Sequence, residues 1–315
     1  MMFSASDLGL LISSTLTYAA PLIIAGMGSI MSESSGVVNI GIEGKMTIGA
    51  FSCAAVSVLT GNLWIGLFAG ILAGAFFGFL HALASITFKA DQTISGIAIN
   101  LLAPGASIYF CKAIFEGATQ TRPVDLADKL PVVLGNIFPA DSFFNYMFKN
   151  YLSVYACLIL AVGIWFLLFK TRYGLRIRAV GEHPRAAATL GISVFRVRYF
   201  CVLLSGILAA LGGAIIPLST VSYFFPSIIS GQGFIAIAAV IFGKFKPKNT
   251  VLACFLFGFC KSLALALGNP KFGFSVSVHL LNMIPYIITL AALLFIGRSH
   301  APAASGKIYD PSSTG

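Results

Sequence analysis

The stretch LWIGLFAGILAGAFFGFLHALASITF, residues 63–88, contains no Asp, Glu, Lys or Arg. A helix of roughly 20 apolar residues is long enough to cross the hydrocarbon core of a bilayer. The run is continuous, whereas a strand of a membrane barrel would alternate apolar and polar residues over about ten positions. The stretch therefore predicts a membrane-spanning helix.

The same pattern recurs along the chain. Further apolar segments lie at 8–31, 46–60, 94–115, 151–169, 199–217, 233–243, 250–267 and 276–297. Segments 46–60 and 233–243 are short for a full crossing, and short or broken helices are tolerated at membrane depth where protein or a cavity covers the freed backbone. We therefore expect these two segments to line a pathway. The predicted fold is an all-α polytopic membrane protein of about eight to ten transmembrane helices, forming one domain over residues 1–315.

Composition excludes most other classes of protein. Of the 315 residues, 58% are hydrophobic and 10% are charged, whereas an average soluble domain carries about 25% charged residues. A soluble enzyme, a disordered chain and a secreted disulfide scaffold are excluded on this ground. All six cysteines lie in apolar stretches without a C-x-x-C pair, so no metal site or disulfide framework is predicted.

The net charge of +10 is distributed unevenly. Loop 170–198 holds seven Lys or Arg residues against one Glu, whereas loop 116–149 holds three basic and four acidic residues. Cytoplasmic loops are enriched in Lys and Arg. We therefore expect 170–198, turn 244–249 and tail 298–315 to face the cytoplasm, and loop 116–149 and the N-terminus to face outside. Lys45 counts among the predicted cytoplasmic bases, and nucleic acid is not an expected partner.

The cytoplasmic stretch GEHPRAAATLG, residues 181–191, predicts a two-turn helix. Pro184 suits the first helical position, and Gly191 suits the position just past the end. Helices this short are marginal alone in water, so this helix is expected to dock. The sequence leaves two alternatives for the surface on which it docks. The first is the membrane surface or neighbouring loops, and the second is a cytoplasmic partner with an acidic groove.

Three stretches together resemble one family. GEHPRAAATLGI (181–192) is similar to the G-E-N-P-x-A-A-x-x-x-G-I signature of permease subunits in bacterial ABC importers of the branched-chain amino acid, ribose and nucleoside permease superfamily. SGVVNIGIEGKMTIGAF (35–51) and GQGFIAIAAVIFGKFKP (231–247) resemble two further family stretches. The resemblance covers nearly the whole chain. His183 departs from the family pattern, which has Asn there.

The resemblance implies a transport subunit and its partners. Helix 182–191 would sit in a groove of a separate ATP-binding subunit, which would carry the ATP and Mg²⁺. A second homologous permease (forming a homodimer or heterodimer), an extracytoplasmic solute-binding lipoprotein and membrane lipid would complete a system in the bacterial inner (cytoplasmic) membrane. The residues proposed for coupling are Glu182, His183, Pro184, Arg185, Ala187, Ala188 and Gly191. A bulky charged residue at Ala187 or Ala188 is expected to uncouple the ATPase and leave folding intact.

The chain itself lacks the sequence of an ATP site. A phosphate-binding loop commonly reads G-x-x-x-x-G-K-[ST]. Each Gly-Lys pair here, at 44–45, 243–244 and 306–307, lacks both the first glycine and the following Ser or Thr. H-E-x-x-H and G-x-S-x-G are absent as well. We therefore expect a transport subunit with no catalytic site and no cofactor of its own.

Four polar residues are candidates for the solute pathway. Asn100 and Lys261 lie within apolar segments. Asn39 and Glu43 lie between two apolar segments, in a region that the resemblance implies is near the translocation route. The alternatives are a cytoplasmic turn with Glu43 solvated or paired to Lys45, an interhelical hydrogen bond for Asn100, and a side chain reaching the outer interface for Lys261. A second set is predicted to pack helices closely, because small residues at every fourth position form a bare ridge: Gly66, Gly70, Gly74 and Gly78.

Two other functional readings remain. A stand-alone secondary transporter or channel would often carry acidic groups at mid-membrane, but Glu33, Glu43 and Asp91 lie at segment edges. An ABC permease for sugars or branched-chain amino acids is the second alternative. The residues GVVNIGIEG (36–44) resemble nucleoside-type members more than the G-G-x-D-x-S-x-G pattern of sugar-type members, so nucleosides are the favoured substrate.

Overall fold

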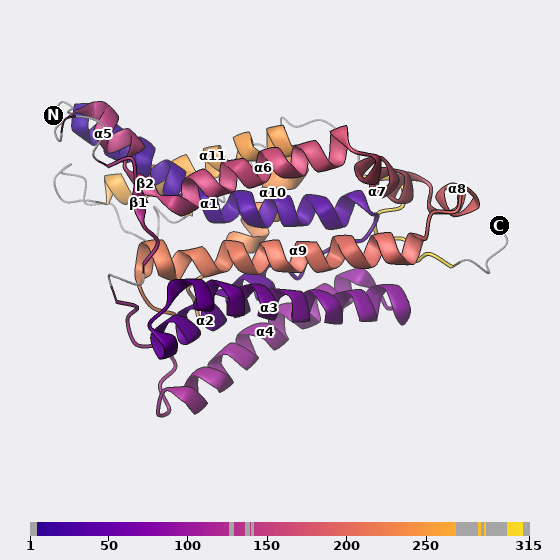
Figure 1. Cartoon of the computed structure of the whole chain (residues 1–315), viewed down its shortest axis with the longest axis horizontal. Coiled ribbons are helices and arrows are strands. Elements are labelled where there is room, and N and C mark those ends of the chain that lie inside the picture. Colours follow the sequence, from indigo (N-terminus) through magenta and orange to yellow (C-terminus); the bar gives the residue numbers. More distant parts are fainter. Residues whose placement is uncertain are drawn as a thin grey trace.

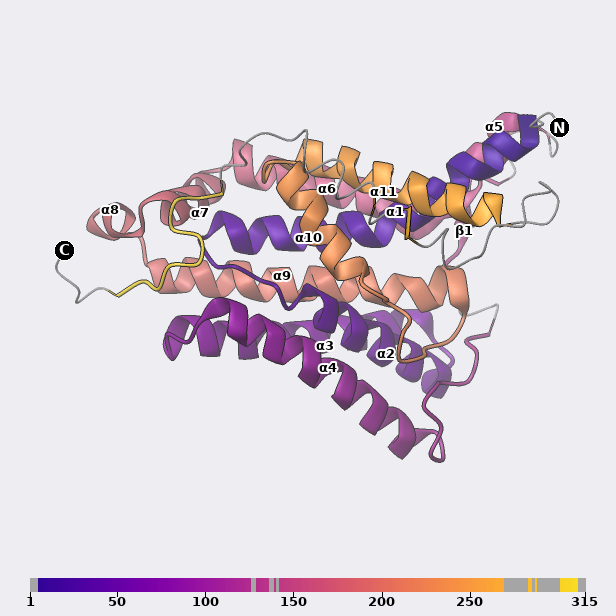
Figure 2. The same cartoon turned by 180° about the vertical axis from the view of Figure 1, so that it is seen from behind.

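The computed structural model describes residues 5–125, 129–135, 139, 142–268, 283, 284, 287 and 301–310. Within this part of the chain, seven helical segments are long and apolar enough to cross a membrane. The long helices are α1 (Ala5–Ser34), α2 (Ile42–Thr60), α3 (Leu63–Ala82), α4 (Gln92–Ile114), α6 (Leu152–Lys170), α9 (Val194–Ile216) and α11 (Pro247–Leu267). This confirms the prediction of an all-α polytopic membrane protein (Figures 1 and 2).

Shorter elements connect these helices. Two π-helical turns, η1 (Leu83–Thr87) and η3 (Pro217–Val221), extend α3 and α9. In a two-stranded antiparallel pair, β1 (Val132–Val133) lies in the loop 116–149 predicted to be outside, and β2 (Asn150–Tyr151) directly follows that loop. The remaining short helices are α5 (Phe143–Phe148), α7 (Arg172–Glu182), α8 (Pro184–Thr189) and α10 (Gln232–Phe242).

One of the two predicted short helices is longer than its apolar segment. α10 has 11 residues, as predicted. α2 begins at Ile42 and has 19 residues, so it is longer than segment 46–60 and is long enough, by length and composition, to cross a membrane. It also begins at a break inside the bundle, as expected of a broken helix (Figure 2). The helix starts earlier because its polar first turn, which carries Glu43 and Lys45, finds partners inside the bundle. The predicted segment 276–297 lies almost wholly outside the described residues.

α1 and α9 form the centre of the bundle. α3, α2 and α1 all pack against α9, while α11 and α6 pack against α1 (Figure 1). Small residues permit the closest approaches. A Cβ atom on Gly28 of α1 would lie 2.9 Å from the Ser205 carbonyl oxygen of α9, and one on Gly212 of α9 would lie 2.8 Å from the Pro21 carbonyl oxygen of α1. These glycines bring the two backbones within contact distance.

The two ends of the bundle carry different segments. α7, α8 and residues 301–310 lie at one end, whereas α5, β1, β2 and the start of α1 lie at the other (Figure 1). The basic loop 170–198 and the loop 116–149 are therefore at opposite ends, an arrangement that follows the charge distribution. Lys45 departs from it: its side chain has no exposed surface and lies inside the bundle. Counting Lys45 among the cytoplasmic bases was wrong, because it does not belong to a loop.

α2 and α10 both begin inside the bundle. Residues 35–41 run from the end of α1 back toward the middle, where α2 starts (Figure 2). α10 starts at Gln232, directly after its N-cap residue Gly231, and the first turns of the two helices touch. A Cβ atom on Gly233 would lie 2.6 Å from the Glu43 Cα atom. Two helix N-termini from distant parts of the chain thus meet in the interior.

Candidate functional site

The break between α1 and α2 leaves backbone groups that no helix satisfies. In a lipid environment each unpaired N–H or C=O would destabilise the fold by several kcal/mol. Side chains from α3 and α4 replace the missing helical bonds at Val38. Its N–H donates to Gln92 Oε1 at 2.7 Å, and its carbonyl oxygen lies 3.0 Å from His81 Nε2. His81 is buried, and its other ring nitrogen lies 2.9 Å from Ser95 Oγ.

Asn100 closes the other end of the break. Its side-chain Nδ2 donates to the Ile40 carbonyl oxygen at 3.0 Å, and its Oδ1 accepts from the Gly44 N–H at 2.8 Å. Asn100 therefore uses both ends of its amide on the backbone of residues 40–44. It holds the break in the position that lets α2 begin inside the bundle.

Glu43 connects the break to α10. Its two carboxylate oxygens accept from the N–H groups of Gly231 and Gly233, each at 2.7 Å. These amides belong to the first turn of α10, where N–H groups lack helical partners and negative charge is favoured. Glu43 therefore links two helices that begin inside the bundle, through residues that are 188 positions apart in the chain. It forms no ion pair with Lys45, and the solvated or Lys45-paired turn left open by the sequence is not formed.

Lys45 and Asn39 form a buried polar chain with α9. Lys45 Nζ donates to Asn39 Oδ1 at 2.6 Å, and Asn39 Nδ2 donates to Ser205 Oγ at 2.8 Å. Lys45 and Ser205 have no exposed surface, and Asn39 is 1% exposed. Ion pairs between described residues include Lys89–Asp310 and Arg122–Glu116. The Lys45 ammonium is thus held by a neutral amide inside the bundle.

The structure brings three of the four pathway candidates together. Asn39, Glu43 and Asn100 all lie at the break where α2 begins. Lys261 lies apart from them, half-buried on α11. Its neighbour Ser262 donates to the Leu11 carbonyl oxygen at 3.0 Å, near the start of α1. That contact places Lys261 toward the predicted outer end of the bundle.

The glycine ridge of α3 lies between α2 and α9. A Cβ atom on Gly70 would lie 3.1 Å from the Gly49 carbonyl oxygen of α2. One on Gly74 would lie 2.5 Å from the Gly206 carbonyl oxygen of α9 and closer still to Ala210 Cβ. Gly66 faces Ser57 and Cys53 of α2, and Gly78 faces Val202 and Gly206 of α9. Any side chain on this ridge would separate α3 from its neighbours.

α8 has the boundaries that the sequence predicts. Pro184 occupies the first turn, and Gly191 follows the helix with a φ of +78°. Ala187 is 2% exposed and packs with Val180 and Val194. The expectation that a bulky charged residue at Ala187 leaves folding intact was therefore wrong, because that residue would have to displace this small apolar cluster. Ala188 is half-buried beside the same cluster.

The exposed face of α8, taken here together with the flanking residues Glu182, His183 and Leu190, carries different residues. Glu182, His183, Arg185 and Ala186 are exposed, and Leu190 at the tip is 81% exposed. Ala186 and Leu190 were not among the predicted coupling residues. The signal for Leu190 was present in the sequence, since it is a large apolar side chain within a polar loop. The sequence does not show that Leu190 is exposed, because this depends on which face of α8, the one with Ala187, packs inward.

Comparison with known proteins places this architecture in a family. Residues 11–293 match the family described as branched-chain amino acid transport system / permease component. The chain belongs to this family. A guanosine ABC transporter permease protein of Bacillus subtilis (NupQ) is 45% identical over 96% of this chain and 97% of its own. A nucleoside ABC transporter permease protein of Lactococcus lactis (NupC) is 38% identical over 96% and 98%. A second guanosine permease protein of B. subtilis (NupP) is 27% identical over 92% and 82%.

This family member is a multi-pass membrane protein, and its matched region includes both the break and α8. Residues 301–310, here called the C-terminal tail, lie beyond that region. They pack against α7 and α8. The Ala304 N–H donates to the Gly181 carbonyl oxygen at 2.9 Å, and the Ala303 N–H donates to Glu182 Oε2 at 3.2 Å. The sequence does not predict this contact, because the tail carries no hydrophobic periodicity.

Proposed function

We propose that this chain is the membrane-spanning permease subunit of an ATP-driven importer of nucleosides. The observation that carries the proposal is the 45% identity, over nearly the full length of both chains, to a permease named for guanosine. A second relative named for nucleosides supports the same substrate class. The stretch that resembles nucleoside-type members, residues 36–44, forms the break at the centre of the bundle.

The proposal includes separate partners. ATP would be hydrolysed by an ATP-binding subunit, because the sequence lacks a phosphate-binding loop. The exposed face of α8 would dock on that subunit. Two relatives with guanosine in their names occur in one organism at 45% and 27% identity, which favours a heterodimer of this chain with a second permease. An extracytoplasmic lipoprotein would deliver the solute.

The mechanism proposed is alternating access driven by the ATPase. A ligand shifts a conformational equilibrium only by its differential affinity for the two states. ATP binding would supply that difference by moving α8, which short connections join to α7 and α9 in the chain. α9 contacts the break through Ser205 and Asn39, so its motion would reach the start of α2. Glu43 would carry the same motion to α10.

The charge of the site favours an uncharged solute. Helix N-termini inside transporters often bind anionic groups of the substrate. Here the Glu43 carboxylate already occupies the Gly231 and Gly233 amides. A nucleoside carries no phosphate and would not compete for them. Pathway roles for Asn39, Glu43 and Asn100 are part of this proposal, and Lys261 would lie nearer the outer entrance.

Uptake by reconstituted vesicles tests the proposal. The complete system, with ATPase, second permease and lipoprotein, should accumulate labelled guanosine only when ATP is present. Unlabelled nucleosides should compete, whereas ribose and leucine should not. Uptake by this chain alone, without ATPase, would favour a stand-alone transporter. Competition by ribose or leucine instead would reassign the substrate.

A further inference from the structure

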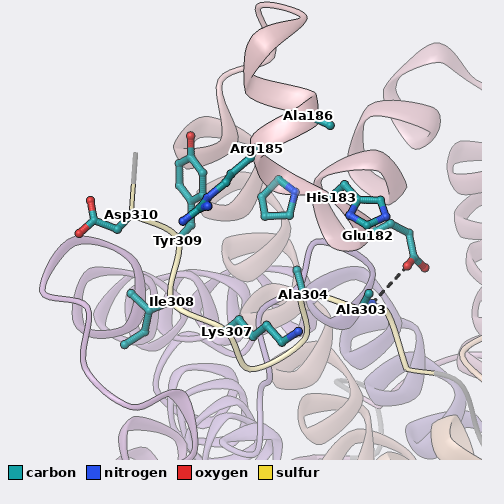
Figure 3. Close-up of a pocket in the computed structure, with 11 residues that line it drawn as sticks. Glu182, His183, Arg185, Ala186, Ala303, Ala304, Lys307, Ile308, Tyr309 and Asp310 are labelled. Atoms are coloured by element: carbon teal, nitrogen blue, oxygen red, sulfur yellow. Dashed lines mark hydrogen bonds between the residues drawn. The ribbon is translucent and has the colours of Figure 1, made fainter. Parts of the chain in front are cut away.

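A pocket of about 470 Å³ lies between α8 and the C-terminal tail. Figure 3 shows His183 and Arg185 from the α8 side, and Lys307 and Tyr309 from the tail, arranged around one opening. The pocket is outside the membrane-spanning helices and beside the face of α8 proposed to dock. It is therefore positioned to take part in the same contact.

The tail that forms one wall of this pocket is held at several points. Ser305 Oγ donates to Glu33 Oε2 at the end of α1, at 2.9 Å. Arg198 of α9 donates to the Lys307 carbonyl oxygen at 3.2 Å, and its guanidinium lies 6.0 Å from the centre of the Tyr309 ring. Phe195 packs edge-on against the same ring. These contacts fix the backbone from which the Lys307 side chain projects.

Bases outnumber acids at this pocket by one when Lys89, which pairs with Asp310 at 2.9 Å, is counted. The three bases are Arg185, Lys307 and Lys89, and the two acids are Asp310 and Glu182, which keeps its negative charge while it accepts from the Ala303 N–H. Lys307 is exposed at the rim, and Arg185 faces the same opening. The surrounding loop 170–198 carries seven bases against Glu182. A surface of this sign attracts and orients a negatively charged partner.

We propose that this pocket receives an acidic side chain of the ATP-binding subunit, so that the C-terminal tail forms the second half of the docking surface. The proposal rests on the proposed function. Binding at this pocket would strengthen docking and would also transmit motion to the membrane helices. The tail joins α8 to the ends of α1 and α9 through Glu33 and Arg198, so a partner seated in the pocket pulls on both central helices.

Charge reversal at the rim tests the proposal. The complete complex, carrying an affinity tag on this chain, is assembled in nanodiscs of neutral lipid, and binding of the ATP-binding subunit is titrated. Lys307→Glu should weaken binding by about tenfold, and raised salt should reduce the difference from the native chain. Lys307→Gln should lie between the two. The matched control is Lys248→Glu, which makes the same charge change at an exposed lysine that lines a different pocket.

The outcomes separate the possible failures. The proposal is overturned if Lys307→Glu, Lys248→Glu and the native chain bind the ATP-binding subunit equally well. The proposal is also overturned if Lys307→Glu weakens binding of the ATP-binding subunit in nanodiscs of anionic lipid but not in nanodiscs of neutral lipid, since the pocket would then bind lipid. Restored binding of Lys307→Glu by an ATPase variant with one surface acid changed to Lys supports it. If the native chain recovers no ATPase subunit at all, the proposed function itself fails.

Discussion

The carboxylate of Glu43, in the first turn of α2, accepts a 2.7 Å hydrogen bond from the backbone N–H of Gly231 at the start of α10. The Gly233 N–H makes a second bond of the same length. One side chain thus holds together two helices that begin inside the membrane domain. The arrangement uses the unsatisfied amides and the positive end of one helix to fix the other.

Glu43→Gln should destabilise the protein by about 2 kcal/mol. Glutamine has one acceptor oxygen, so one glycine amide would face an NH₂ group, and both bonds would lose their charge. The thermal unfolding midpoint and ATP-driven uptake should both fall. Glu116→Gln is the control, since the Glu116 side chain is 88% exposed and should tolerate the change. Equal midpoints for the two variants would show that the bridge is dispensable.

Gly74→Ala should disrupt the contact between α3 and α9. The added methyl group would lie 2.5 Å from the Gly206 carbonyl oxygen, and overpacking of this kind typically destabilises by about 1–3 kcal/mol. The matched control is Gly163→Ala on α6, where a Cβ atom meets nothing within 4 Å. That change should be neutral or slightly stabilising, because Ala is the better helix former. Similar unfolding midpoints for the two variants would contradict the role of the ridge.

Asn39 and Lys45 should be energetically coupled. Asn39→Ala removes the hydrogen-bond acceptor of the fully buried Lys45 ammonium group. The free energy of unfolding should fall by about 3 kcal/mol, because a buried charge is left unsatisfied. Lys45→Met keeps the length of the side chain and removes the charge, so it should be tolerated better.

The double variant provides the decisive comparison. Once Lys45 is replaced by Met, Asn39→Ala should have a much smaller effect, giving a coupling energy of about 1–3 kcal/mol. Unfolding midpoints of the four proteins in one detergent would measure it. Strict additivity would mean that the 2.6 Å contact contributes nothing to stability.

Leu190→Glu should impair docking without affecting folding. Leu190 is 81% exposed at the tip of α8, and losing an apolar anchor at an interface commonly weakens binding by more than 1 kcal/mol, about fivefold or more. Binding of the ATP-binding subunit and transport-coupled ATP hydrolysis should fall, with the unfolding midpoint unchanged. Leu190→Met is the conservative control and should retain binding. If Leu190→Glu binds the ATP-binding subunit as tightly as the native chain does, Leu190 is not part of the docking surface.

The sequence predicted features that depend on local composition. Long apolar runs located α1, α3, α4, α6, α9 and α11, because a lipid environment selects helices with continuous apolar surfaces. The ends of α8 followed from Pro184 and Gly191, since both residues have backbone preferences that act locally. Three resembling stretches identified the family that the comparisons then confirmed.

Other features could not be predicted, because they depend on residues far apart in the chain. The amide partners of Glu43 lie 188 and 190 residues away, and Ser205 lies 166 residues from Asn39. Periodicity cannot select such pairs. The charge rule assigns Lys45 to the cytoplasm because it counts bases by their position between apolar runs. That pattern does not show that a buried amide, here Asn39, can accept a hydrogen bond from the ammonium group.

The sequence by itself therefore determined which segments enter the membrane and which end of the bundle is basic, because each of these depends on the transfer of local groups between water and lipid. Only the tertiary structure decided which polar groups satisfy one another at the break, which face of α8 is exposed, and that the C-terminal tail completes the surface beside α8. These are matters of packing geometry, in which the free energy of a residue depends on neighbours that its own stretch of sequence does not contain.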